Sequence, residues 1–151
     1  MSEMNSRPAR VAEGAAGPSA GRTSTVARSG AAMALLLRGT ANLVYAAILL
    51  LGGLAPNPPE ISRAVSDTTL HGVAYLIQTL LLFWLARAFL GTMPALVSAA
   101  LGAAAYSTLV ELCQLLQPAR SFEGRDLAAN FAGVVVACAV ALVASATMRR
   151  W

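Results

Sequence analysis

Four long apolar runs dominate the sequence, and each is long enough to cross a lipid bilayer. A transmembrane helix needs about 20 predominantly apolar residues. The four runs cover residues 35–55, 69–90, 95–116 and 126–147. Prolines that a helix rarely continues through, Pro56, Pro94 and Pro118, lie between them. Because the runs are rich in Ala, Gly, Leu and Val without regular polar alternation, the sequence predicts a bundle of four transmembrane helices and not a barrel of strands.

The composition excludes a soluble domain. Of the 151 residues, 57% are hydrophobic and 12% are charged, whereas soluble domains carry about 25% charged residues. Residues 1–30 differ from the rest, because they are rich in Ala, Gly, Ser and Arg and show no apolar periodicity, so we predict a disordered tail there. The sequence thus predicts an all-α membrane protein with a tail at 1–30 and a four-helix transmembrane domain at 31–151. We expect no separate catalytic domain outside the membrane.

Small residues predict where two of the helices approach each other. They are Gly102, Ala103, Ala104 and Ala105 in the third run and Ala128, Ala129, Ala132 and Gly133 in the fourth. Since small side chains let helix backbones come close in a membrane, we predict tight packing between the third and fourth helices.

Arginines predict the orientation in the membrane. All eleven basic residues are Arg and the net charge is +4. With four spans, both termini lie on the same side of the membrane. Five arginines lie near that side, namely Arg28, Arg38, Arg87, Arg149 and Arg150. Three lie near the opposite side, namely Arg63, Arg120 and Arg125. The positive-inside rule then puts both termini in the cytoplasm. The arginines do not cluster with aromatic residues, so we expect no nucleic-acid partner.

Polar side chains gather at one end of the predicted bundle. Antiparallel threading brings the start of the second helix, the end of the third and the start of the fourth to one membrane face. The polar residues there are Asp67, His71, Glu111, Gln114, Arg120, Asp126 and Asn130. Helical spacing places most of these residues, with a few others, in one stripe on each helix. The stripes are Asp67, His71, Tyr75 and Gln78 on the second helix, Ser107, Glu111 and Gln114 on the third, and Asp126, Asn130 and Gly133 on the fourth. Because ionisable groups at membrane depth face a bundle interior or a wet cavity, we predict one polar pocket that opens outward.

Simpler roles exist for several of these residues. Asp67 and Asp126 open helices, so both suit the capping of backbone N–H groups. His71 suits a helix-packing contact. Glu111 differs, because it lies about two turns before Pro118, hence about 10 Å from the helix end, where a carboxylate needs a partner or a proton. Arg120 and His71 are the two candidate partners.

The polar motifs resemble those of the VanZ-like membrane protein family. The resemblance rests on Asp67-Thr68-Thr69-Leu70-His71 with Tyr75, on Glu111 with Gln114, on Pro118-Ala119-Arg120 with Phe122, and on Asp126 with Asn130 and Gly133. Thr68 and Ala119 depart from the family pattern, which has Lys and Gly there. The resemblance implies a cell-envelope protein of the bacterial inner membrane, since the family takes its name from an accessory protein associated with glycopeptide (teicoplanin) resistance in Gram-positive bacteria.

Three functions stay open. In the first, a non-enzymatic envelope protein binds a lipid-linked or lipid-tailed ligand, and Arg120 pairs with its phosphate or carboxylate. In the second, an intramembrane enzyme acts on a lipid headgroup. His71 is the base or nucleophile, Asp67 or Glu111 orients it, and Arg120 stabilises developing negative charge. The third is a membrane scaffold with an internally neutralised polar cluster. The absence of a nucleophile motif or phosphate loop favours the first. We expect no cofactor. The carboxylates and histidine could also hold a divalent metal, but they lack a metal-specific spacing, so we predict no metal.

Overall fold

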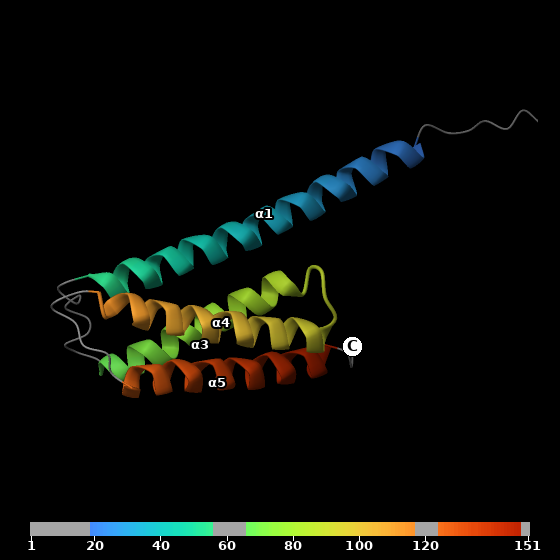
Figure 1. Ribbon diagram of the computed structural model, residues 1–151. Helices are drawn as coiled ribbons and strands as arrows, with labels where there is room; N and C mark the ends of the chain where they lie inside the picture. Colours follow the sequence, from blue (N-terminus) through green and yellow to red (C-terminus); the bar gives the residue numbers. More distant parts are fainter. Residues whose placement is uncertain (1–18, 56–65, 117–123, 149–151) are drawn as a thin grey trace, which may run out of the picture. The chain divides into compact units, whose positions relative to one another are not determined.

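The structure, a computed structural model, describes residues 19–55, 66–116 and 124–148, with side chains from residue 28 onward in these ranges. Its elements are four α-helices, α1 (Ser19–Leu54), α3 (Asp67–Ala86), α4 (Thr92–Gln114) and α5 (Gly124–Met148) (Figure 1). The chain divides into two compact units, Met1–Ala32 and Met33–Trp151. The bundle described below belongs to the second unit, and the all-helical prediction is confirmed.

The first helix begins earlier than the predicted span. Ser19 directly follows Pro18, and no proline interrupts the chain from there to Leu54. Residues 19–30 contain Ala and Arg, which favour helix, but Ser, Thr and Gly, which favour it less, are more numerous there. Helix α1 nevertheless includes residues 19–30, which the sequence assigns to the tail, while residues 1–18 lie outside the described part. The portion of α1 that is long and apolar enough to span a membrane is Arg28–Leu54.

Local signals also set the starts of α3 and α4 earlier than predicted. The Ser66 hydroxyl accepts a hydrogen bond from the backbone N–H of Thr69 at 3.3 Å, which caps α3. Asp67 then lies in the first turn, where the helix dipole favours negative charge. In α4, Pro94 lies inside the first turn, where proline is tolerated, so the helix begins at Thr92 and not after the proline.

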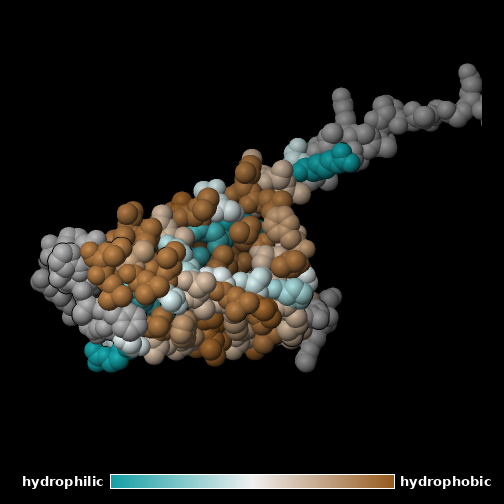
Figure 2. All heavy atoms as spheres, viewed as in Figure 1, coloured by the Kyte–Doolittle hydropathy of each residue, from teal (hydrophilic) through white to brown (hydrophobic). Residues whose placement is uncertain are grey.

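The outer surface of the helices is apolar. All four helices are long and apolar enough to cross a membrane. Leu43, Leu101 and Val135 are among many large hydrophobic side chains that are exposed, and Figure 2 shows hydrophobic residues over much of the visible face of the helices. Soluble proteins rarely expose contiguous apolar surface on this scale. The chain is therefore a multi-pass membrane protein.

Helices α3 and α5 touch through their backbones at a pair of glycines. A Cβ atom at Gly133 would collide with the carbonyl oxygen of Gly72 and would lie 3.0 Å from the backbone nitrogen of Leu76. A Cβ atom at Gly72 would lie 3.4 Å from the carbonyl oxygen of Ala129. The nearest atoms around Gly133 thus belong to α3, whereas the sequence predicts α4 as its partner. The small residues that α4 buries are Ala95, Ala99 and Ala103, and Ala105 is exposed.

Helix α1 contacts the other helices through polar side chains. The Asn42 amide donates a hydrogen bond to the carbonyl oxygen of Leu81 in α3 at 2.9 Å. The Tyr106 hydroxyl of α4 donates to the carbonyl oxygen of Ala46 in α1 at 2.5 Å. Such interhelical hydrogen bonds contribute about 0.6 kcal/mol each in membranes. These bonds place α1 against the same bundle that carries the polar end.

Replacing Gly133 by alanine is expected to destabilise the bundle, because the added methyl group meets backbone atoms that cannot rotate away. Overpacking of this kind costs about 1–3 kcal/mol. Gly102→Ala is the matched control, since its Cβ atom would meet the flexible Leu82 side chain at an ordinary 3.5 Å. Thermal unfolding of both variants in one detergent measures the difference. A Gly133→Ala protein as stable as Gly102→Ala would show that the two backbones do not touch as described.

Candidate functional site

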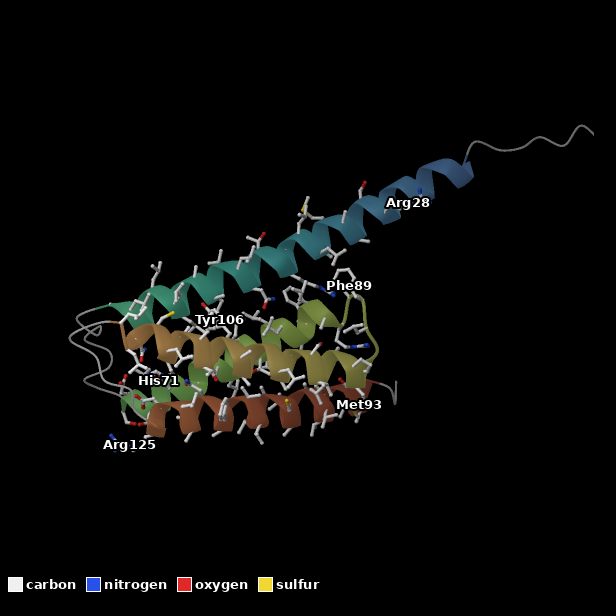
Figure 3. All side chains as sticks on the ribbon, viewed as in Figure 1. Arg28, His71, Phe89, Met93, Tyr106 and Arg125 are labelled. Atoms are coloured by element: carbon white, nitrogen blue, oxygen red, sulfur yellow. The ribbon has the colours of Figure 1, made fainter. Side chains whose placement is uncertain are left out.

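One end of the bundle brings together polar residues from three helices. The start of α3, the end of α4 and the start of α5 meet there (Figure 1). His71 of α3 contacts Glu111 of α4 and both Asp126 and Asn130 of α5. We call these four residues, together with Asp67, the His71 cluster. Figure 3 places His71 at this end and Met93 at the opposite end of the bundle.

The buried half of the cluster surrounds Nδ1 of His71. This nitrogen lies 3.2 Å from Oδ1 of Asn130 and 3.7 Å from Oε1 of Glu111. The Asn130 amide donates to the same Glu111 oxygen at 3.4 Å. Glu111 is 1% exposed and Asn130 is 0% exposed. Because both oxygens near Nδ1 are acceptors, this nitrogen carries a proton when it bonds to them.

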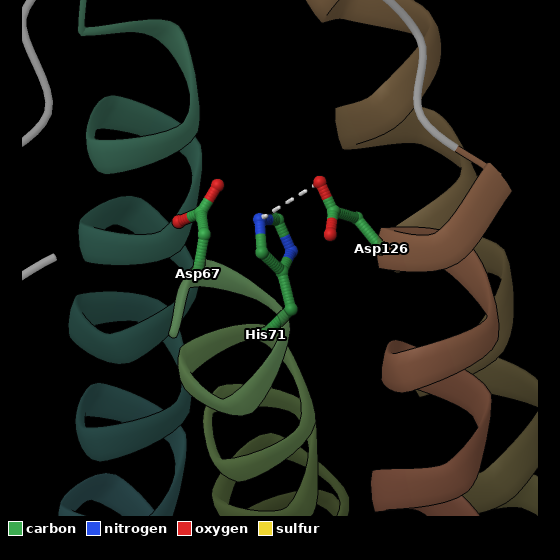
Figure 4. A group of neighbouring side chains, drawn as sticks. All are labelled: Asp67, His71 and Asp126. Carbon is green, nitrogen blue, oxygen red and sulfur yellow. Dashed lines mark ion pairs between the residues drawn. The ribbon is translucent and has the colours of Figure 1, made fainter. Parts of the chain in front are cut away.

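The other half of the cluster, with exposed Asp67 and buried Asp126, surrounds Nε2 of His71. Nε2 lies 3.9 Å from Oδ2 of Asp126, and the Thr68 hydroxyl donates to the other oxygen of Asp126 at 3.5 Å. One potential ligand atom each from Asp67, His71 and Asp126 lies within 4.8 Å of the other two. Figure 4 shows the imidazole between the two carboxylates. The His71 side chain is 19% exposed, Asp67 is exposed and Asp126 is buried, so this half is only partly accessible.

Helical spacing and close helix packing create this arrangement. Asp67 and His71 are four residues apart on α3, as are Asp126 and Asn130 on α5, so each pair lies on one face of its helix. Gly72 is the neighbour of His71 in the chain, and its carbonyl group is the one that Gly133 approaches. The glycine contact therefore brings the two polar faces within hydrogen-bonding reach.

The other predicted site residues have different surroundings. Gln114 is buried, but its amide donates to the carbonyl oxygen of Gly53 at 3.2 Å and so joins α4 to α1. Tyr75 and Gln78 are buried, and the Tyr75 hydroxyl and Oε1 of Gln78 have no hydrogen-bond partner among the described residues. Arg120 lies outside the described residues. Of the seven residues predicted to line a site, five thus form the His71 cluster.

Thr68 and Asn42 are among the polar residues whose structural roles were not predicted. Thr68, noted in the sequence only as a departure from the family pattern, contacts Asp126. Asn42 is buried and bonds to Leu81. Its signal was available, because Asn42 is the single amide side chain in the first apolar run. A lone amide in such a run indicates an interhelical hydrogen bond.

The chemistry of the cluster follows from its charges. Three carboxyl groups, those of Asp67, Glu111 and Asp126, surround one imidazole. Nε2 is directed toward the exposed end, where it suits proton transfer, a cation or an ion pair. Arg125, in the first turn of α5, is exposed at the same end (Figure 3).

Comparison with known proteins identifies the family. Neither the curated proteins nor the solved structures yielded a match. A family model described as VanZ/LLP1 matches residues 25–145, a range that contains the four candidate spans except the last residues of α5. The motifs that resemble the VanZ-like family lie inside this range. The chain belongs to the VanZ/LLP1 family.

Proposed function

We propose that this chain is a bacterial cell-envelope protein that binds the polar headgroup of a lipid-linked or lipid-tailed ligand at the His71 cluster. Membership of the VanZ/LLP1 family supports an envelope role. An accessory role in glycopeptide resistance is the specific form of this proposal. The bundle itself supplies lipid contact along its apolar outer surface, so a lipid-tailed ligand reaches the cluster from within the bilayer.

The observation that carries the proposal is the division of His71 into a fixed side and an open side. Its Nδ1 lies 3.2 Å from Oδ1 of buried Asn130, within hydrogen-bonding distance, and buried Glu111 lies beside the same nitrogen at 3.7 Å. Its Nε2 lies 3.9 Å from Asp126, beyond hydrogen-bonding distance. A scaffold with an internally neutralised cluster needs no open side. A ring that is held at one nitrogen and partly exposed suits a contact with a ligand.

Arginine supplies the anion contact in this proposal. Arg120 precedes α5 by a few residues, and its guanidinium pairs in bidentate fashion with phosphate or carboxylate. Asp67 and Asp126 orient that arginine and bind the hydroxyl or amine groups of the headgroup.

Binding of a polyprenyl phosphate to the protein in nanodiscs tests the proposal. We expect the phosphate to bind and the matching uncharged polyprenol not to bind, measured by native mass spectrometry. Arg120→Ala and His71→Ala are expected to weaken binding by about 10–100-fold, because each removes a charge-assisted contact of about 1.5–3 kcal/mol. Thr147→Ala is the control, since Thr147 bonds only to its own helix near the other end of α5. Equal binding of alcohol and phosphate would reject a headgroup site.

The same variants test the resistance role in cells. At equal membrane levels, Glu111→Gln, His71→Ala and Arg120→Ala are expected to change susceptibility to a lipoglycopeptide in the same direction, while Thr147→Ala does not. Lipid-precursor pools, measured in parallel, report which ligand the protein meets. Unchanged susceptibility and unchanged pools in all three variants would contradict a functional site.

The proposed topology places both termini in the cytoplasm and the His71 cluster at the outer face. The five-to-three distribution of arginines supports it. A fluorescent protein fused after Trp151 is expected to fluoresce, and alkaline phosphatase fused there to be inactive. Alkaline phosphatase inserted in the segment between α1 and α3 is expected to be active. The reverse pattern would turn the cluster toward the cytoplasm.

A lipid-headgroup enzyme is the second candidate, and the geometry around Nδ1 favours it. A carboxylate that holds one imidazole nitrogen while the other faces a substrate is the arrangement of a general base. In that case Nε2 of His71 accepts a proton from the attacking water or hydroxyl group. Release of a headgroup from the bound lipid by the wild type, lost in His71→Ala, identifies the enzyme, whereas a ligand recovered intact identifies the binding protein.

A further inference from the structure

We propose that Asp67, His71 and Asp126 form a binding site for a divalent transition-metal cation of the zinc class. One potential ligand atom from each residue lies within 4.8 Å of the other two. The sequence predicts no metal here, because the three residues come from two helices and show no metal-binding spacing. Their placement in space, and not their spacing in the chain, carries the inference.

The distances suit a metal that draws the ligands slightly together. Oxygen and nitrogen ligands lie about 2.0–2.2 Å from zinc in a tetrahedron, so two ligand atoms are about 3.3–3.6 Å apart. Nε2 of His71 and Oδ2 of Asp126 are 3.9 Å apart. Asp67 is exposed at the start of α3, so its carboxylate reaches the shared point by side-chain rotation alone.

The contacts behind His71 are a second observation that points to a metal. A histidine that binds a metal usually donates its other ring N–H to a carboxylate or carbonyl group, which orients the ring. Here Nδ1 faces Asn130 at 3.2 Å and Glu111 at 3.7 Å, both buried. This pairing leaves Nε2 as the metal-binding nitrogen, directed toward the two aspartates. Glu111 and Asn130 are therefore positioning residues in this proposal.

When the proton of His71 lies on Nδ1, electrostatics favour a cation at the same point. With its proton on Nδ1, a neutral imidazole presents a lone pair at Nε2. That lone pair faces carboxylate oxygen across 3.9 Å, which is repulsive. A cation between them removes the repulsion. The alternative is a proton on Nε2, in either the neutral ring or the imidazolium, which directs an N–H toward Asp126 and leaves no lone pair for a metal.

The donor set selects the type of cation. Imidazole nitrogen suits zinc and its neighbours in the transition series, whereas magnesium and calcium prefer oxygen alone. Two carboxylates and one imidazole leave a coordination position for water or for a phosphate oxygen. Metal binding does not rest on the proposed function, because it is measured on the protein without any lipid ligand.

Zinc binding to the purified full chain in detergent tests the proposal. The protein carries a non-histidine affinity tag and Cys113→Ser and Cys138→Ser substitutions, which removes other strong ligands. Because His71 is the single histidine, ¹⁵N-histidine NMR reports on this ring alone. We expect calorimetry to give one zinc per chain and the Nε2 resonance to shift on zinc addition, with magnesium producing neither effect.

Substitutions separate ligands from positioning residues. Asp67→Asn and Asp126→Asn are expected to abolish zinc binding, and Glu13→Gln, which removes a carboxylate from the tail, to leave it unchanged. Asp67 is exposed, so Asp67→Asn tests the ligand without disturbing the packed interior. Glu111→Gln is expected to weaken zinc binding by about 10–100-fold while Nε2 remains the bound nitrogen.

Two results would overturn the metal site. One is a wild-type ring that stays protonated on Nε2 at saturating zinc, which leaves no lone pair there for a metal. The other is zinc binding of equal strength in the wild type and both aspartate variants. Either result leaves headgroup binding to be decided by the polyprenyl phosphate experiment alone.

Discussion

The contact between Gly72 and Gly133 is the constraint on which the polar end of the bundle depends. It brings the backbones of α3 and α5 together, one residue from His71 and one helical turn from Asn130. A side chain at Gly133 separates the helices there. The hydrogen bond between His71 and Asn130 is 3.2 Å long and is lost at about 3.6 Å. A change that separates α3 from α5 at Gly133 therefore also breaks the hydrogen bond between His71 and Asn130.

Buried Glu111 adds a second reason why the site depends on the packing of the helices. Its carboxyl group is 1% exposed at the end of an apolar helix, where an unpaired charge costs several kcal/mol. Its partners, His71 and Asn130, come from α3 and α5, so the group is satisfied only when three helices meet in one register. Ala-rich helix faces such as that of α4 pack in several registers with similar contacts. The polar cluster thus selects one register among those that packing permits.

Helix order and helical periodicity predicted part of this site from the sequence. Antiparallel threading and the 3.6-residue period correctly brought His71, Glu111 and Asn130 to one end, because both depend only on helix order and spacing. The partner of Gly133 was predicted wrongly, since the same small-residue stripe suits any neighbouring helix. The early start of α1 was missed because residues 19–30 show no apolar periodicity from which a helix could be predicted. The separate surroundings of the two imidazole nitrogens follow from the position of Asp126 relative to the ring, which no spacing rule supplies.

The carboxylates of Asp67 and Asp126 beside Nε2 of His71 limit which ligands this end of the bundle can bind. Two unit charges 4 Å apart interact by about 1 kcal/mol in bulk water and by about 4 kcal/mol near a protein surface. A phosphate or carboxylate that approaches His71 directly thus meets repulsion from both Asp67 and Asp126. An anionic headgroup binds there only when positive charge lies between it and the aspartates. Arg120, a metal cation on Nε2, or both together meet this requirement, and a cationic headgroup needs neither. An anionic headgroup therefore binds with the help of Arg120 or of a bound metal, whereas a cationic headgroup binds without a metal on Nε2.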